Sequence, residues 1–154
     1  MKTNFRVRMK IVIAALLVSV ITGLYATSPA PKKGSIALKS LTAITFNKDG
    51  VLFLADPLGT HMYAMETKGT AQPDPEKIMV SNIDEKVGAL LGVQMKDIKI
   101  VDMAVHPISK EIYLAVTRKG TPAQSVLIKC DHSGNLQPVV LNDVSYYETS
   151  ITDV

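Results

Sequence analysis

The 154-residue chain has one cysteine, Cys130, no tryptophan and only 5% aromatic residues. With a single thiol, no disulfide can form within the chain, so its apolar core must hold the fold together. The lack of tryptophan and the scarcity of aromatic rings weigh against a surface that stacks bases or sugars. The sequence also lacks a Gly-x-Ser-x-Gly elbow, a P-loop and a dinucleotide-binding fingerprint. The sequence therefore carries no catalytic signature.

The first 26 residues have the three parts of a secretory signal peptide. A basic head comes first, formed by Lys2, Arg6, Arg8 and Lys10. The apolar run Ile11–Leu24 and a small-residue exit over residues 25–28 follow it. An uncleaved anchor is the alternative, but a helical run of this length spans only about 21 Å of a ~30 Å hydrocarbon core. We therefore predict cleavage after Ala26, export to the periplasm or the cell exterior, and no membrane span in the mature chain.

The formal net charge of +3 originates in the segment that is predicted to be removed. Four of the 17 Lys and Arg residues lie in residues 1–26, whereas all 14 Asp and Glu residues lie beyond them. The mature chain is therefore nearly neutral. Its charge gives no support for nucleic-acid binding, and no nucleic-acid partner is predicted.

Two short apolar strands joined by a tight turn organise the chain, and their first copy is Leu41–Asp56. The β-prone residues predict strands over 43–46 and 51–55, and Asn47–Gly50 has the composition of the turn between them. The second of these strands is almost continuously apolar, which is typical of a strand covered on both faces. A third strand is predicted over 61–66.

A second copy of this unit, Val101–Val116, matches the first strand by strand. Leu52–Ala55 corresponds to Ile112–Ala115, and Met62–Glu66 corresponds to Leu127–Asp131. Recurrence of this kind indicates a repeat architecture, and repeated β-hairpins favour a β-propeller.

The pattern divides the chain into segments along its length. These are a signal peptide (1–26), a linker with a candidate edge strand over 35–40 (27–40), blade one (41–80), a helical insertion (81–99), blade two with a fourth strand over 138–141 (100–141), and the start of a further blade (151–154). In the insertion, a helix is predicted over 83–91, with Ser81 or Asn82 as its cap and Gly92 as its stop.

The four-stranded units, the Asp-Gly turn and the apolar strand ending in alanine resemble the blades of secreted bacterial β-propellers. The resemblance is to the broad group of NHL, YVTN and quinoprotein-like propellers and covers about residues 41–154. It implies an all-β fold of about two blades plus the start of a third. Because known propellers close with roughly four to eight blades, we expect the chain to be an N-terminal fragment. A complete two-blade protein that assembles as an oligomer is the alternative.

Asp102 and Asp153 occupy equivalent positions at the entrance to a first strand, which lines the channel of a propeller. Carboxylates repeated there form a candidate site for a divalent cation such as Ca²⁺. The alternative is that each Asp caps a turn or accepts backbone N–H groups. Blade one has Thr42 and Ala43 at this position, so the ring of carboxylates is incomplete, and the backbone role is favoured.

The remaining candidate side chains have ordinary structural explanations. His61, His106 and His132 lack the spacing of metal ligands, and His106 and His132 are predicted to be solvated turn residues. The segment Asp131–Asn135 resembles a calcium loop faintly but lacks its alternating acidic ligands, so a hairpin turn is predicted. Cys130 is expected to be a small buried hydrophobic residue.

The function that follows is an exported, non-catalytic propeller that serves as a scaffold for a small-molecule or protein ligand. The alternative is a metal-dependent hydrolase similar to lactonase propellers, which bind their metal through channel-facing Glu, Asn and Asp. Only Asp102 and Asp153 could match such a site.

Overall fold

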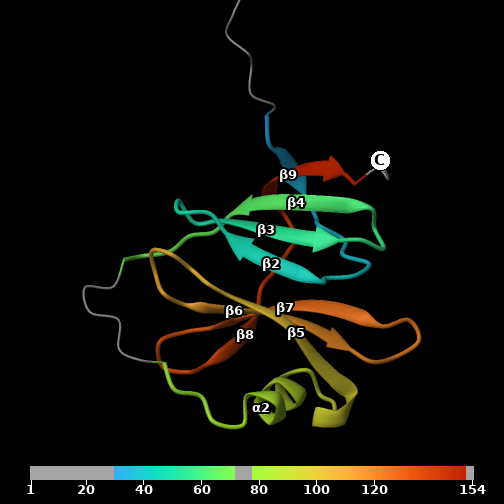
Figure 1. The fold of residues 1–154 in the computed structure, drawn as a ribbon, viewed down its shortest axis with the longest axis vertical. Helices are drawn as coiled ribbons and strands as arrows, with labels where there is room; N and C mark the ends of the chain where they lie inside the picture. Colours follow the sequence, from blue (N-terminus) through green and yellow to red (C-terminus); the bar gives the residue numbers. More distant parts are fainter. Residues whose placement is uncertain (1–29, 72–77, 152–154) are drawn as a thin grey trace, which may run out of the picture. The chain divides into compact units, whose positions relative to one another are not determined.

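The computed structural model describes residues 30–71 and 78–151, and all elements below lie within the unit Pro31–Val154. These residues form two antiparallel sheets and one short α-helix (Figure 1). The predicted all-β class with one short helix is confirmed at this level. Within the described ranges the sheets close into neither a barrel nor a ring.

None of the helices in the described part of the chain has the length and apolar character needed to cross a membrane.

The first sheet has the strand order β1-β9-β4-β3-β2. Its centre is a meander of β2 (Ala43–Phe46), β3 (Val51–Asp56) and β4 (His61–Glu66), which confirms the three strands predicted there. In the first turn, the Asn47 backbone N–H donates to the Val51 carbonyl at 3.0 Å. Gly50 has φ of 85°, a conformation that glycine adopts without strain.

The second sheet has the order β5-β6-β7-β8. Its strands are β5 (Ile98–Val105), β6 (Ile112–Arg118), β7 (Gln124–Cys130) and β8 (Leu136–Pro138). The fourth strand thus begins and ends earlier than the predicted range 138–141. The Asp131 carboxylate accepts hydrogen bonds from the Ser133 and Asn135 backbone N–H groups at 2.9 Å each. The segment therefore forms the predicted turn, which here joins β7 to β8.

The two meanders pair their strands at corresponding residues. Leu54 pairs with Tyr63 in the first sheet, and Leu114 pairs with Ile128 in the second. Every pair between β3 and β4 that lies in the matched segments has such a counterpart between β6 and β7.

Opposite faces of the two sheets meet in the main core. The first sheet contributes Ile44, Leu52, Leu54, Tyr63 and Met65, and the second contributes Tyr113, Ala115 and Leu127. By register, Ala115 corresponds to Ala55, which points to the other face of its own sheet. The two sheets therefore contribute non-corresponding faces to the core. The face of the second sheet that enters the core corresponds, residue by residue, to the face of the first sheet that points away from it.

The helix α2 (Ile83–Leu90) covers the other face of the second sheet, where Val87 packs with Leu114, Val116 and Ile128. As a result, both faces of β6 are buried, whereas in β3 buried residues alternate with partly exposed ones. Burial on both faces was predicted for β3, and it is found in β6 instead. The helix thus lies on a sheet face.

The helix ends largely follow the prediction, with one exception. Gly92 follows the helix with φ of 67° and acts as its stop. Asn82 is the N-cap residue, but its side chain makes no capping hydrogen bond to the backbone and donates to the Glu85 carboxylate at 3.0 Å.

Two strands outside the meander complete the first sheet. The strand β9 (Val144–Ser150) pairs with β4, and β1 (Lys32–Gly34) pairs with β9. An edge strand thus exists in the predicted linker, although at 32–34 rather than 35–40. The Ile151 backbone N–H donates to the Thr60 carbonyl at 2.8 Å, so this residue also meets the first sheet. The rest of the expected start of a further blade, 152–154, lies outside the described residues.

Candidate functional site

A polar cavity of about 280 Å³ lies at the end of the sheets where the β2–β3, β5–β6 and β7–β8 turns are found. We call it the polar pocket. Its lining residues are Lys68, Thr70, Ser109, Glu111, Lys129 and His132. Lys68 and Thr70 follow β4 of the first sheet, and the other four belong to the second sheet and its turns. Both sheets therefore build the pocket.

Glu111 is the centre of a fixed polar group in the pocket. One carboxylate oxygen, Oε1, lies 2.8 Å from Lys129 Nζ. The other, Oε2, accepts a hydrogen bond from the Ser109 hydroxyl at 3.0 Å. The Glu111 side chain is only 14% exposed, so this pair is less screened by solvent than a surface ion pair. Lys129 is therefore neutralised within the protein.

His106 lies behind this group and is completely buried, so the prediction of a solvated turn residue is wrong. Its Nδ1 atom accepts the backbone N–H groups of Ile108 and Ser109 at 3.2 and 3.0 Å. Because Nδ1 is an acceptor, the ring proton of neutral His106 is on Nε2. Burial lowers the pKa of His106, against the opposing charge of Glu111. The neutral ring orients the turn that presents Ser109 and Glu111.

Aromatic contacts and close backbone packing hold the His106 ring. Phe46 lies edge-to-face with it, at a ring-centroid distance of 5.0 Å. Phe46 also meets Tyr113 in the same way, and burial raises the pKa of Tyr113 to about 12. A Cβ atom built on Gly69 would lie 2.4 Å from His106 Cε1, and one on Gly50 would lie 3.0 Å from Nε2. The His106 ring thus fills the space between the second sheet and the turns of the first sheet.

Lys68 is the lining side chain whose charge has no partner in the described ranges. None of the carboxylates in residues 30–71 and 78–151 forms an ion pair with it. The Nε2 atom of His132 also lacks a hydrogen-bond partner in the described part of the chain, but it is buried and is therefore not open to the pocket. A buried polar atom without a partner is unfavourable.

Asp102 does not face this pocket but ties the two sheets together. One of its carboxylate oxygens accepts the Ile44 backbone N–H of β2 at 2.8 Å, and the other accepts its neighbour Met103 N–H at 2.8 Å. The favoured backbone role of Asp102 is thus what the structure shows. Asp153 lies outside the described residues. Among those that are described, no group of three or more His, Cys, Asp and Glu side chains could hold a metal ion.

Cys130 is buried as predicted, with 1% exposure, and burial raises the pKa of its thiol. It borders an apolar cavity of about 210 Å³ on the helix-bearing face of the second sheet, with Met103, Ile112 and Leu114 among the lining residues. A thiol that is harder to ionise is a weaker nucleophile.

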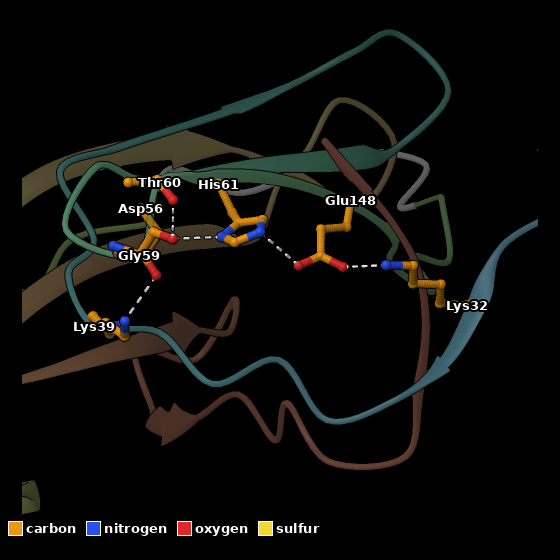
Figure 2. A network of polar contacts seen from close by, with 7 residues as sticks. All are labelled: Lys32, Lys39, Asp56, Gly59, Thr60, His61 and Glu148. Atoms are coloured by element: carbon orange, nitrogen blue, oxygen red, sulfur yellow. Dashed lines mark hydrogen bonds and ion pairs between the residues drawn. The ribbon is translucent and has the colours of Figure 1, made fainter. Parts of the chain in front are cut away.

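Figure 2 shows a second polar network, which joins the three neighbouring strands β1, β9 and β4 of the first sheet. Glu148 on β9 bonds to Lys32 on β1, and its Oε1 lies 3.2 Å from His61 Nε2 on β4. The other His61 nitrogen faces the Gly59 carbonyl. Because a carbonyl and a carboxylate only accept hydrogen bonds, the ring satisfies both contacts when both nitrogens carry protons. The network therefore connects the strands β1, β9 and β4.

At the other end of Figure 2 the buried Asp56 carboxylate holds two loops together. It accepts the backbone N–H groups of Lys39, Ser40 and Gly59 at 3.0, 2.7 and 2.9 Å, and the Ser40 hydroxyl at 2.8 Å. Burial alone would raise the pKa of Asp56, but these hydrogen bonds hold it below its usual range. All of its partners belong to the protein, so this carboxylate has a structural role.

Of the side chains that were singled out in the sequence and are described by the structure, only His132 lines the polar pocket. The other five lining residues were not recognised. The available signal was topological, because the turns 47–50, 106–111 and 131–135 and the end of the strand 61–66 meet at one end of two antiparallel meanders.

The fold and the pocket define an antiparallel two-sheet protein with a small polar cavity at its turn end. Searches of protein-family models, of curated proteins and of solved structures find no match to the chain.

Proposed function

We propose that the protein is an exported, non-catalytic binding protein of the propeller type, in which the polar pocket holds a small polar ligand. The observation that carries this proposal is the pocket itself, where both sheets place polar side chains around a cavity of about 280 Å³. Small-molecule sites are concave, carry a few convergent polar groups and are often found between structural layers. The volume suits a ligand smaller than most cofactors.

The packing of the sheets supports the assignment of the two meanders to neighbouring blades. Repeats that follow one another around an axis pack one face against the opposite face of the next. Ala115 of the second sheet is buried against the first, and its counterpart Ala55 lies on the open face of the first sheet. That open face carries a shallow apolar hollow of about 90 Å³, as expected where a further blade would pack.

The engagement of the reactive groups supports a binding role over catalysis. The Ser109 hydroxyl donates to Glu111, and Glu111 is also paired with Lys129. These three groups satisfy one another and orient the pocket. The carboxylate oxygens of Asp102 are likewise occupied by backbone N–H groups, so nothing in its contacts favours the hydrolase alternative.

Export rests on the sequence of residues 1–26, with their basic head, short apolar run and small-residue end. The mature protein then begins at Thr27 and acts in the periplasm or outside the cell. Terminal sequencing of the protein recovered from a bacterial host tests this, and an intact Met1 on a membrane-bound product would refute it.

Binding is tested by a thermal-shift screen with small polar metabolites, followed by titration of each stabilising compound. The variant Thr70→Phe places a ring at the exposed rim of the pocket and should abolish the shift. Thr149→Phe, at an exposed position on β9, is the matched control and should retain it. Turnover of a lactone or phosphoester panel by the purified protein would overturn the non-catalytic assignment.

A further inference from the structure

We infer that the polar pocket takes the oxyanion group of a small ligand, a carboxylate or a phosphate, with Lys68 as its principal donor. This inference rests on the proposed function and names the class of ligand. The chemistry shared by the two groups is a negatively charged oxygen that accepts several hydrogen bonds.

The charges of the pocket favour an anion. Among the described residues, Glu111 is the one acidic side chain in the lining, and both of its oxygens have protein partners, Lys129 and Ser109. The charge of Lys129 is thereby balanced, whereas that of Lys68 has no carboxylate partner among the described residues. Within the described residues, the lining therefore carries one positive charge that no carboxylate balances.

The hydrogen-bonding groups of the pocket also favour an anion. The Lys68 ammonium has three N–H donors and no acceptor, and the Thr70 hydroxyl can donate as well. An acceptor-rich, negatively charged group matches this set of donors.

The lining also limits the size and shape of the ligand. No arginine of the described ranges lines the pocket, so these residues do not provide the planar bidentate recognition that a guanidinium gives to a carboxylate. An ammonium acts as a point charge and accepts a tetrahedral phosphate or a planar carboxylate. The cavity of about 280 Å³ leaves room for a few further atoms beside the charged group.

The test is a titration of the exported full-length protein with sodium phosphate, sodium acetate and glucose at constant ionic strength, followed by amide NMR shifts. Phosphate or acetate should shift the amides of Thr70, Ser109 and Lys129, and the comparison of the two salts identifies the preferred oxyanion. Lys68→Met keeps the length of the side chain and removes its charge, so it should weaken binding about tenfold to a hundredfold, the range for loss of one charged hydrogen-bond partner.

Lys48→Met is the matched control, because Lys48 is a 90% exposed lysine in the β2–β3 turn outside the pocket lining. Equal weakening by both variants would mean general charge attraction and would overturn the inference. Pocket shifts with glucose but with neither salt would overturn the oxyanion class and leave the binding function standing. Shifts with none of the three probes would refute the inference, and a negative metabolite screen in addition would refute the binding function.

Discussion

Replacement of Gly69 by alanine should destabilise the protein through one contact, that with His106. The Cβ atom would lie 2.4 Å from Cε1 of the ring and 2.9 Å from both ring nitrogens, closer than real Cβ contacts approach. The ring has no room to retreat, because it is fully buried and its Nδ1 atom accepts two backbone N–H groups. The clash must therefore shift the β5–β6 turn or the strand end at Gly69.

The size of the effect follows from the energetics of overpacking, which typically costs about 1–3 kcal/mol. In a domain of this size, 1 kcal/mol lowers Tm by roughly 3–6 °C. We therefore expect the Tm of Gly69→Ala to fall by about 5–15 °C. The backbone of Gly69 is not left-handed, so the alanine itself adds no conformational strain.

Gly34→Ala is the control, because a Cβ atom there meets no atom within 4 Å. Its stability should stay within about 0.5 kcal/mol of the wild type. Urea and thermal denaturation followed by circular dichroism give the free energies of unfolding. The decisive measurement is the double mutant Gly69→Ala/His106→Ala, in which the penalty of the alanine at 69 should largely vanish and give a coupling energy of about 1–3 kcal/mol. If Gly69→Ala lowers the free energy of unfolding equally with and without the His106 ring, the clash between residue 69 and this ring is refuted as the cause.

Two further predictions concern buried titratable groups. Asp56→Asn removes a charged acceptor of four hydrogen bonds and should lower the free energy of unfolding by about 2–4 kcal/mol at pH 7. Because the folded-state pKa of Asp56 is depressed, its stabilisation is present above the unfolded pKa of about 3.9 and is lost as the pH falls through the folded value. Urea denaturation at pH 7 and pH 3 should show the deficit of the variant shrinking at the lower pH, and a constant deficit would contradict this. For His106, the folded-state pKa is also depressed, so its neutral form stabilises the fold above the unfolded pKa of about 6.5 and this contribution is lost at lower pH. The stability difference between the wild type and His106→Leu should therefore fall from pH 7.5 to 5.5, and a difference that is flat with pH would show that the ring does not titrate with unfolding.

The local parts of the fold could be predicted from the sequence because their signals are local. The turn at Asn47–Gly50 needs a residue that tolerates positive φ, and the sequence supplies glycine there. The runs of β-prone residues give β2, β3 and β4, and the stop at Gly92 gives the end of α2. Such signals involve residues that are neighbours in the chain.

The completion of the first sheet could not be predicted in the same way. The strand β9 joins β4 across a large sequence separation, and β1 then pairs with β9. Nothing in Val144–Ser150 specifies its partner, because strands with similar patterns compete for the same edge. Only the tertiary structure shows that Tyr63 and Tyr146 meet edge-to-face and that Glu148 reaches both Lys32 and His61.

The polar pocket shows why a site shared by two sheets is hard to find in a sequence, and also where a usable signal lay. Gly50 is explained by its positive φ, but Gly69 has no such need. A glycine that the backbone does not require indicates that another group approaches closely. Here that group is His106, whose burial aligns the turn carrying Ser109 and Glu111 with the end of β4. A glycine of this kind beside Lys68 and Thr70 thus marks the place where the two sheets meet, and the Lys68 ammonium at this place is the basis of the proposed oxyanion site.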